Sequence, residues 1–472
     1  DICAMANVLL AEEGAAALTL PEARGFVGSG ASIFVERMRR ARGIAEAEHP
    51  RLLARFLDLY EGAVTHSALY PGVVDALAAE EEENWVWAGA SCRYPDYDRC
   101  MVALSVGGAD AAVRREFDLE TREFVADGFY VPESKSSIAW RDRDSVFYGP
   151  AFSDEEVTDS GYPRTVRLWK RGQQPAESEL VFEGEKGDVA VTGVRFWDGD
   201  DFYDMIVRVP DFFTRHYYRY DDGEIRRIHV PEDADVAGML DGQLLVELKS
   251  DWEVDGTTYP QGALVAGPLA SFEADAPELA VVFRPGERAS ISGVTTTEST
   301  VIVNVLDNVV GKLLRFTHGD DGWRSEALDT PDLGAIGVVT ADDRSDRFFF
   351  NYEGFLTPST LFEADAMDDS REAVRAEPSW FDAEGMAVTQ YQTESADGTV
   401  IPYFVVTPAG FEADGANPTL LYGYGGFEVP LRPSYSGVRG TAWLERGGVY
   451  VVANIRGGGE FGPKWHQAAR KE

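Results

Sequence analysis

The 472-residue chain has little cysteine, little lysine and no long apolar run. It contains 3 cysteines, and lysine supplies only seven of its 43 basic residues. Three cysteines are too few for a disulfide scaffold, and no Cys/His spacing matches a zinc site. No apolar stretch reaches the roughly 18 residues that a membrane-spanning helix needs. These absences exclude a small disulfide-stapled domain and predict that the chain has no membrane span.

Positive charge is also scarce relative to negative charge. The sequence has 81 acidic residues against 43 basic ones, which gives a net charge of −38. A field of this sign repels polyanions, so we expect neither nucleic acid nor an anionic membrane as a partner. The acidity is typical of a solvated surface, either of an ordinary kind or adapted to high salt, and an acidic functional patch is the alternative.

Two of the cysteines, Cys92 and Cys100, stand on either side of a polar segment that is typical of a hairpin turn. A bridge between them is conceivable. Buried free cysteines are common, however, and behave as small apolar side chains. We therefore expect two free buried thiols rather than a disulfide.

The pattern of the sequence changes twice, which divides the chain into three predicted domains. A length of 472 residues with 44% hydrophobic residues predicts two or three globular domains. Residues 1–79 favour helices, residues 80–382 are short β-branched and aromatic runs, and residues 383–472 hold longer strands that lead into helices. The expected helices of the first part cover residues 4–13, 32–42 and the segment that begins at Pro50.

The middle part repeats a unit of two strands joined by a tight polar turn. The units recur roughly every 40–58 residues, which is typical of four-stranded β-propeller blades. A β-sandwich is the alternative, but a run of about 290 residues is too long for one sandwich. The repeats carry no WD or Gly-His signature. Six units are expected, at residues 101–125, 145–183, 200–229, 242–283, 299–328 and 346–376.

The last part predicts the beginning of an α/β domain. A hairpin with its turn at Asp397-Gly398 precedes two apolar runs, Pro418–Tyr422 and Val449–Ile455. A helical stretch at Trp443–Arg446 separates the runs. Continuous apolar runs with a crossover between them predict parallel strands that are buried on both faces. A further helix is expected from Lys464 onward.

Tyr424 is the residue here that could carry chemistry. It follows the first apolar run, in the glycine-rich turn Tyr422–Phe427. Catalytic groups of open α/β sheets lie at the carboxyl ends of strands, and glycines let the backbone approach a ligand closely. A phenol at that place can donate a hydrogen bond to an oxyanion. Simple packing of Tyr422 and Tyr424 beside the turn is the alternative that the residues alone leave open.

This turn and the segments after it resemble the prolyl oligopeptidase family of serine peptidases. The Gly-Tyr-Gly-Gly-Phe form is closer to prolyl oligopeptidases than to the oligopeptidase B type. The resemblance covers about residues 80–472 and includes the segments Asn84–Trp87 and Cys100–Leu119, which are similar to propeller sequences of bacterial members. Its most specific segments are Tyr422–Phe427, Pro433–Ser436, Trp443–Val449, Ala453–Gly462 and Trp465-His466.

The resemblance implies a Ser-His-Asp peptidase in which a β-propeller caps an α/β-hydrolase domain and admits short peptides, cleaved after proline. It implies an oxyanion-hole role for Tyr424 and a proline-pocket role for Phe427, whose apolar ring suits the pyrrolidine. Arg456 is expected to pair internally, and His466 to be structural, because the family's base lies later in the chain. No cofactor and no metal are implied, and the complete protein is expected to be monomeric. We expect a soluble protein of the cytoplasm, with the periplasm left open.

The chain departs from the family pattern at both ends. No Gly-x-Ser-x-Gly nucleophile elbow occurs in the 472 residues. In the family the serine follows the helix that begins near Lys464, and the acid and the histidine come later. We therefore expect the nucleophile, base and acid to be absent, six of seven blades to be present, and the chain alone to be inactive. A half-built parallel sheet also predicts aggregation or dependence on a partner.

Residues 1–79 resemble instead the helical cap of phosphoglycolate-phosphatase-like haloacid dehalogenase enzymes. The Asp-x-Asp motif of such enzymes would precede Asp1. If this resemblance holds, two truncated reading frames meet near Val74–Glu83; an unrelated helical extension is the alternative. The resemblance rests on Asp1–Leu10, Arg24–Gly30, Glu36–Arg42 and His66–Val73.

Three functions are therefore considered. The chain is part of a prolyl oligopeptidase, or a non-catalytic β-propeller module that binds peptides in its channel, or a Mg²⁺-dependent phosphatase of the haloacid dehalogenase type. The missing aspartates argue against the phosphatase. Only the peptidase predicts that a downstream serine-containing segment would restore cleavage after proline, and it is the function that the sequence favours.

Overall fold

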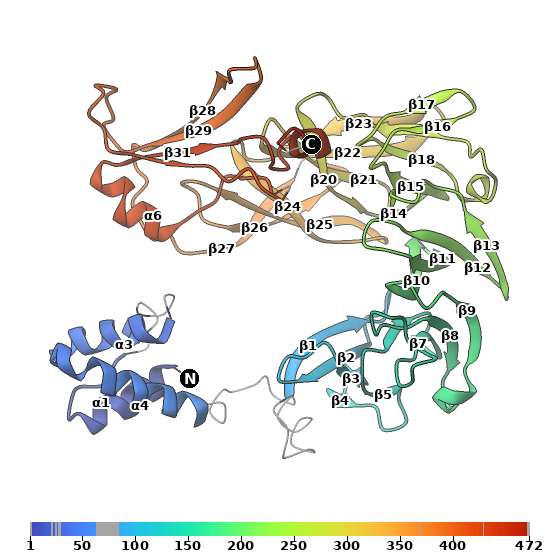
Figure 1. The fold of residues 1–472 in the computed structure, drawn as a ribbon, viewed down its shortest axis with the longest axis horizontal. Helices are drawn as coiled ribbons and strands as arrows, with labels where there is room; N and C mark the ends of the chain where they lie inside the picture. Colours follow the sequence, from blue (N-terminus) through green and yellow to red (C-terminus); the bar gives the residue numbers. More distant parts are fainter. Residues whose placement is uncertain are drawn as a thin grey trace. The chain divides into compact units, whose positions relative to one another are not determined.

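The computed structural model describes residues 2–19, 22–23, 26, 30–62, 85–368, 370–427 and 429–469, and Figure 1 shows the fold. Two compact units are present. The first comprises residues 1–85 and 117–125, and the second comprises residues 86–116 and 126–472. The predicted boundary after residue 79 and the expected join at Val74–Glu83 lie outside the described residues. The predicted boundary after residue 382 stays a prediction.

The first unit is built mainly of helices, as predicted. They are α1 (Ile2–Glu12), α3 (Gly30–Ala41), the 3-10 turn η1 (Glu46–Glu48) and α4 (His49–Gly62). Leu52 and Phe56 lie four residues apart, on one face of α4, and both are buried. They pack in one apolar cluster with Leu9 of α1 and Met38 of α3. The helices are thus confirmed, whereas the resemblance to a phosphatase cap stays a prediction.

Six antiparallel sheets of four or five strands follow between residues 85 and 376 of the described chain, and they confirm the predicted propeller blades. The first sheet contains β1 (Trp85–Cys92), β2 (Arg99–Val106), β3 (Ala112–Asp118) and β5 (Tyr130–Ser134), while β4 (Glu123–Phe124) pairs with the end of β3. The second contains β6 (Ser137–Trp140), β7 (Ser145–Gly149), β8 (Thr165–Lys170) and β9 (Glu179–Glu183). The third contains β10 (Ala190–Asp198), β11 (Asp201–Val209), β12 (His216–Asp221) and β13 (Glu224–Ile228).

The last three blades have the same up-and-down order (Figure 1). The fourth contains β14 (Asp235–Leu240), β15 (Gln243–Glu247), β18 (Leu264–Pro268) and β19 (Ala280–Phe283), with a small hairpin of β16 (Trp252–Val254) and β17 (Thr257–Tyr259). The fifth contains β20 (Ala289–Thr296), β21 (Val301–Asp307), β22 (Val310–Gly319) and β23 (Gly322–Ala327). The sixth contains β24 (Gly334–Asp342), β25 (Ser345–Gly354), β26 (Thr360–Asp365) and β27 (Arg371–Ala376).

Neighbouring blades pack face to face through apolar side chains. One cluster joins Met205 of β11 to Leu244 of β15, and both are fully buried. A buried carboxylate adds a polar link: Asp204 accepts hydrogen bonds from Arg195 of its own blade and Arg141 of the preceding one, each at 2.7 Å. Such a charge is tolerated in the interior because it is paired on both oxygens.

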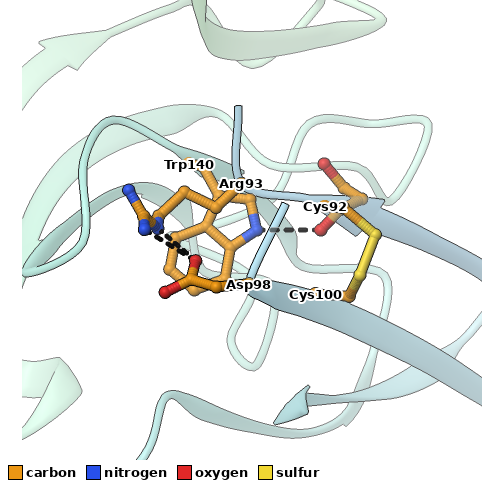
Figure 2. Close-up of a disulfide and its surroundings, with 6 residues drawn as sticks. Cys92, Arg93, Asp98, Cys100 and Trp140 are labelled. Carbon is orange, nitrogen blue, oxygen red and sulfur yellow. Dashed lines mark hydrogen bonds and ion pairs between the residues drawn. A yellow bond between two sulfur atoms is a disulfide. The ribbon is translucent and has the colours of Figure 1, made fainter. Parts of the chain in front are cut away.

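The expectation of free thiols at Cys92 and Cys100 is wrong, because the two form a disulfide. They lie on paired strands, β1 and β2, at the two ends of the turn (Figure 2). Inside the turn, Arg93 donates its backbone N–H to Arg99 O at 2.7 Å and its guanidinium to Asp98 at 2.6 Å. These bonds close the turn and bring the sulfurs together. The sequence shows the spacing of the two cysteines but not the hydrogen bonds that close the turn between them.

The turn inside the disulfide also reaches other blades. The Tyr94 hydroxyl donates to Asp342 at 2.9 Å, and the Tyr94 ring lies 4.8 Å from that of Trp197. Burial, together with the charge of Asp342, raises the pKa of Tyr94. The first blade is therefore tied to the third and the sixth through one aromatic side chain.

The last four strands form a mixed sheet in the order β28-β29-β31-β30. The strands are β28 (Ala387–Glu394), β29 (Val400–Thr407), β30 (Thr419–Tyr422) and β31 (Val449–Ala453). The helical elements of this part are α6 (Gly437–Ala442), the 3-10 turn η5 (Leu444–Arg446) and α7 (Pro463–Gln467). Two further 3-10 turns, η3 (Pro175–Glu177) and η4 (Leu269–Glu273), lie between strands of the propeller. The predicted hairpin is confirmed, and β30 and β31 are parallel as predicted. Helix α6 was not predicted from the sequence, because two of its six residues are glycines, which are poor helix formers.

One prediction about this sheet is wrong: β30 is not buried on both faces. Leu420 and Leu421 are 48% and 68% exposed, whereas Val449 of β31 is 4% exposed. β31 lies between β29 and β30, but β30 is at the edge and pairs only with β31 among the described strands. In the part of the chain that the structure describes, no helix is both long and apolar enough to cross a bilayer.

Candidate functional site

The glycine turn after β30 and the loop after β31 lie against each other at the carboxyl ends of two adjacent parallel strands. Gly425 has φ +64°, and a Cβ there would come within 2.7 Å of Arg456 O. Gly457 has φ +98°, and a Cβ there would come within 2.1 Å of Gly425 O. Both positions therefore require glycine. The carboxyl ends of strands are the edge at which open α/β sheets bind ligands.

Tyr424 lies in this turn with its side chain 48% exposed. Its ring packs over Gly426, where a Cβ would lie 3.4 Å from the ring and 3.7 Å from the hydroxyl. Within the described ranges, no residue makes a hydrogen bond with that hydroxyl. The phenol ring is therefore packed against the turn, while the hydroxyl is not used by the described residues.

Phe427, three residues further along the same turn, is 87% exposed. Its φ of +54° places it in the left-handed region, which is uncommon for a bulky residue. Tyr422 at the end of β30 is also half exposed. The structure thus places both predicted site residues on one turn, with their aromatic side chains accessible.

Arg456 and His466 hold the loop after β31, as expected for structural residues. The Arg456 guanidinium donates to Asp397 in the β28–β29 turn and to Thr399 Oγ1 at 3.2 Å. The hydrogen bond from Arg456 holds the pKa of Asp397 well below its usual range. His466 Nδ1 donates to Gly457 O at 2.8 Å, so its ring is engaged with the backbone. Among the described residues, no group of three or more His, Cys, Asp or Glu is placed to hold a metal ion.

A second arrangement, which the sequence did not reveal, fixes the segment before Pro433. The Glu460 carboxylate is 1% exposed and accepts the backbone N–H of Leu431 at 3.0 Å. Asn454 is fully buried and donates its side-chain amide to Leu431 O at 2.7 Å. Both backbone polar groups of Leu431, its N–H and its C=O, are therefore held by buried side chains. The only signal in the sequence is that Asn454 and Glu460 border the apolar run and the glycines.

A cavity of about 970 Å³ lies beside this segment, in the second unit. One wall is formed by the propeller, at the beginnings of β14 and β20 and the end of β15; the other is formed by residues 430–432 and 459–467. The charged residues of the propeller wall are Arg215, Asp233, Asp235, Glu247, Lys249 and Glu287, and those of the opposite wall are Arg432 and Lys464.

Family models match two parts of the chain. The model described as "Prolyl oligopeptidase, N-terminal beta-propeller domain" matches residues 74–377. The model described as "Prolyl oligopeptidase family" matches residues 433–472. The six blades lie within the first match, and the glycine turn lies between the two matches.

Individual proteins agree with these matches. The chain is 42% identical over 407 residues to an uncharacterised peptidase of Sinorhizobium fredii, covering 84% of this chain and 56% of that protein. It is 38% identical over 403 residues to a prolyl endopeptidase of Elizabethkingia miricola, covering 78% and 51%. A solved structure of a post-proline cleaving enzyme from Rickettsia typhi is similar with a TM-score of 0.73 and 30% identity, covering 84% and 60%. The chain thus spans about half the length of the curated relatives it matches.

Proposed function

The chain belongs to the prolyl oligopeptidase family, and from that membership we propose that it supplies the propeller and part of the active site of a peptidase that cleaves short peptides after proline. The peptidase domain is only partly present in the 472 residues. The observation that carries the proposal is the Tyr424 hydroxyl, which lies in a glycine turn at the carboxyl end of β30 and makes no hydrogen bond with a described residue.

The proposed reaction is acyl transfer from the scissile peptide to a serine. Negative charge develops on the carbonyl oxygen as the tetrahedral intermediate forms, and a fixed hydrogen-bond donor at that place lowers the barrier. Tyr424 is the proposed donor, together with a backbone N–H next to the nucleophile. Phe427 is proposed to line the proline pocket, because an apolar ring suits a pyrrolidine that has no N–H to pair. The 472 residues contain no Gly-x-Ser-x-Gly, so we propose that this chain alone does not cleave peptides.

A chimera tests the proposal. The chain is extended at its end with the corresponding remainder of the Sinorhizobium fredii relative, and cleavage of a peptide p-nitroanilide with proline before the scissile bond is measured. We expect activity in the chimera and none in the unextended chain. Tyr424→Phe should lower kcat about 10²–10³-fold, as loss of one oxyanion donor does. Phe427→Ala should weaken the preference for proline over alanine.

The matched control is Tyr422→Phe, which removes a neighbouring phenol hydroxyl from the same segment and should leave kcat unchanged. A folded chimera that does not cleave after proline, or an equal loss in Tyr422→Phe and Tyr424→Phe, contradicts the proposal. The alternative would then be a propeller module that binds peptides without cleaving them, which the cavity of about 970 Å³ favours.

The compartment is also a proposal. The Cys92–Cys100 disulfide favours the periplasm over the cytoplasm, because structural disulfides persist in the oxidising periplasm and are rare in the cytosol. Alkylation of the protein immediately on cell lysis tests this. A chain in which Cys92 and Cys100 react as free thiols in its native host would instead support the cytoplasm.

A further inference from the structure

Two cations on one wall of the cavity, Arg432 and Lys464, have no partner among the described residues. Exposed arginines such as Arg122 and Arg375 also have no side-chain partner among the described residues, but Arg432 differs from them because it is partly buried. Carboxylates raise the pKa of Arg171 and of Arg208 in the propeller. For Arg432 the only effect is burial, which lowers the pKa of its guanidinium. A partly buried guanidinium without a counter-charge is costly, so an anion that entered the cavity would be stabilised there.

The position of Arg432 is fixed by its neighbours. The N–H and the C=O of Leu431 are held by the buried Glu460 carboxylate at 3.0 Å and the buried Asn454 amide at 2.7 Å. Pro433, on the other side, restricts the backbone of Arg432. The guanidinium is therefore carried by a rigid backbone, and less entropy is lost when it binds a ligand.

The opposite wall of the cavity is different, because its cations are already paired. Lys249 lies 2.5 Å from Glu247 and 3.3 Å from Asp235, and Arg215 lies 3.3 Å from Asp235. Burial disfavours the charged amine of Lys249, but the two carboxylates outweigh it and raise its pKa. With Asp233 and Glu287 also present, this wall is acidic overall and repels anions.

We infer that Arg432, assisted by Lys464, binds a carboxylate of the peptide that occupies this cavity. The inference rests on the proposed function, which makes peptides the ligands. A planar guanidinium pairs with a carboxylate through two parallel hydrogen bonds, which gives both affinity and orientation. The volume of about 970 Å³ suits a short peptide. The acidic wall turns the same peptide so that its carboxylate faces Arg432.

The carboxylate comes either from the free C-terminus of the peptide or from an acidic side chain, and three peptides distinguish these sources. All three are N-acetylated pentapeptides with a central proline. The first ends in a neutral amide, the second in a free carboxylate, and the third is amidated but has glutamate as its last residue. Binding of each to the chain is measured by isothermal titration calorimetry at one salt concentration.

We expect one or both carboxylate peptides to bind about tenfold more tightly than the neutral amide, the gain of a charge-assisted hydrogen-bonded pair. In Arg432→Gln this ratio should fall to about one, while binding of the neutral amide is retained. Arg432→Lys keeps the positive charge but cannot form two parallel hydrogen bonds with a carboxylate, so it should retain part of the preference for the carboxylate peptides. The matched control is Arg347→Gln, which removes the same charge from an exposed ion pair with Glu363 that does not line the cavity.

Equal binding of all three peptides overturns the inference and leaves the proposed function intact. An equal loss in Arg347→Gln and Arg432→Gln also overturns it, since the effect would then be that of net charge. If none of the peptides binds, occupation of this cavity by a peptide is overturned, while the proposed function is judged separately by cleavage in the chimera. In that case N-acetylglycine and its amide serve as probes: discrimination that depends on Arg432 supports the carboxylate site, and its absence overturns the site as well.

Discussion

Two strands of the second unit, β21 in the propeller and β30 in the peptidase segment, have similar apolar sequences but different surroundings. Six of the seven residues of β21 are buried, because this strand lies between two strands of its own blade and between neighbouring blades. All four residues of β30 are exposed. The comparison shows that an apolar run predicts a strand, whereas its burial depends on what packs on both faces and on both edges.

An aspartate in each strand should give the largest difference. Val303→Asp places a charge where the native side chain is fully buried, and we expect a loss of more than about 4 kcal/mol in the free energy of unfolding. Leu421→Asp, at a side chain that is 68% exposed, should change it by less than about 0.5 kcal/mol. Urea denaturation followed by circular dichroism measures both. Equal losses would show that β30 is covered after all.

The disulfide gives the next largest effect, and it acts only on the propeller. Replacing Cys92 and Cys100 by serine removes a constraint on the unfolded chain, and for a loop of this size we expect a loss of about 2–3 kcal/mol. Tyr94 should then make fewer contacts with Trp197, which a change in tryptophan fluorescence would report. A reducing agent should destabilise the parent by a similar amount and leave the double-serine variant unchanged. A reductant effect on that variant would assign the loss to another cause.

A smaller effect is expected for association through the edge of the sheet. The exposed Leu420 and Leu421 leave strand β30 open to another chain. We expect Leu421→Lys to raise the fraction of monomer several-fold in sedimentation velocity, because a lysine at an edge opposes pairing. Val339→Lys in β24 is the control, since Val339 is 60% exposed but lies in a propeller blade. A parent chain that is already monomeric and melts cooperatively contradicts this expectation.

The parts of the fold that sequence reasoning predicted are those with a local signal. Strand pairs, the six blades and the hairpin at Asp397-Gly398 follow from short apolar runs and turn residues, which act within about ten residues of one another. Tyr424 was predicted from a glycine turn that follows a strand, and Phe427 only from the resemblance to the family; both roles stay predictions. The same reasoning could not predict that β30 would be exposed, since that depends on strands and helices far away in sequence.

The features that were missed all join distant segments or depend on closure of a turn. Glu460 and Asn454 hold Leu431 from positions 29 and 23 residues away. Arg432 and the propeller wall line one cavity only because of the tertiary fold, and an isolated arginine in the segment Pro430–Pro433 carries no signal of a site. Cysteine spacing alone does not show whether the turn between Cys92 and Cys100 closes enough to bring the two sulfurs together.

Two aspartates in turns, one in the propeller and one in the peptidase segment, have pKa values that are shifted in opposite directions. Burial, with the charges of Asp342 and Asp198, raises the pKa of Asp343 in the propeller, although a hydrogen bond from Thr296 at 2.7 Å opposes it. The hydrogen bond from Arg456 lowers the pKa of Asp397 in the peptidase segment. Both groups have a pKa of about 3.9 in the unfolded chain.

The two shifts should make the two regions respond to acid in opposite directions. The contribution of Asp343 to stability is fully present below about pH 3.9 and is lost as the pH rises through its raised pKa. The contribution of Asp397 is present above about pH 3.9 and is lost as the pH falls through its lowered pKa. On acidification from neutral pH, the parent should therefore gain stability relative to Asp343→Asn and, at lower pH, lose stability relative to Asp397→Asn. Urea titrations of the three proteins at successive pH values measure both differences, which we expect to be small because Asp397 is exposed and Asp343 is only partly buried. If both differences change with pH in the same direction, the two aspartates do not have the opposite environments described here.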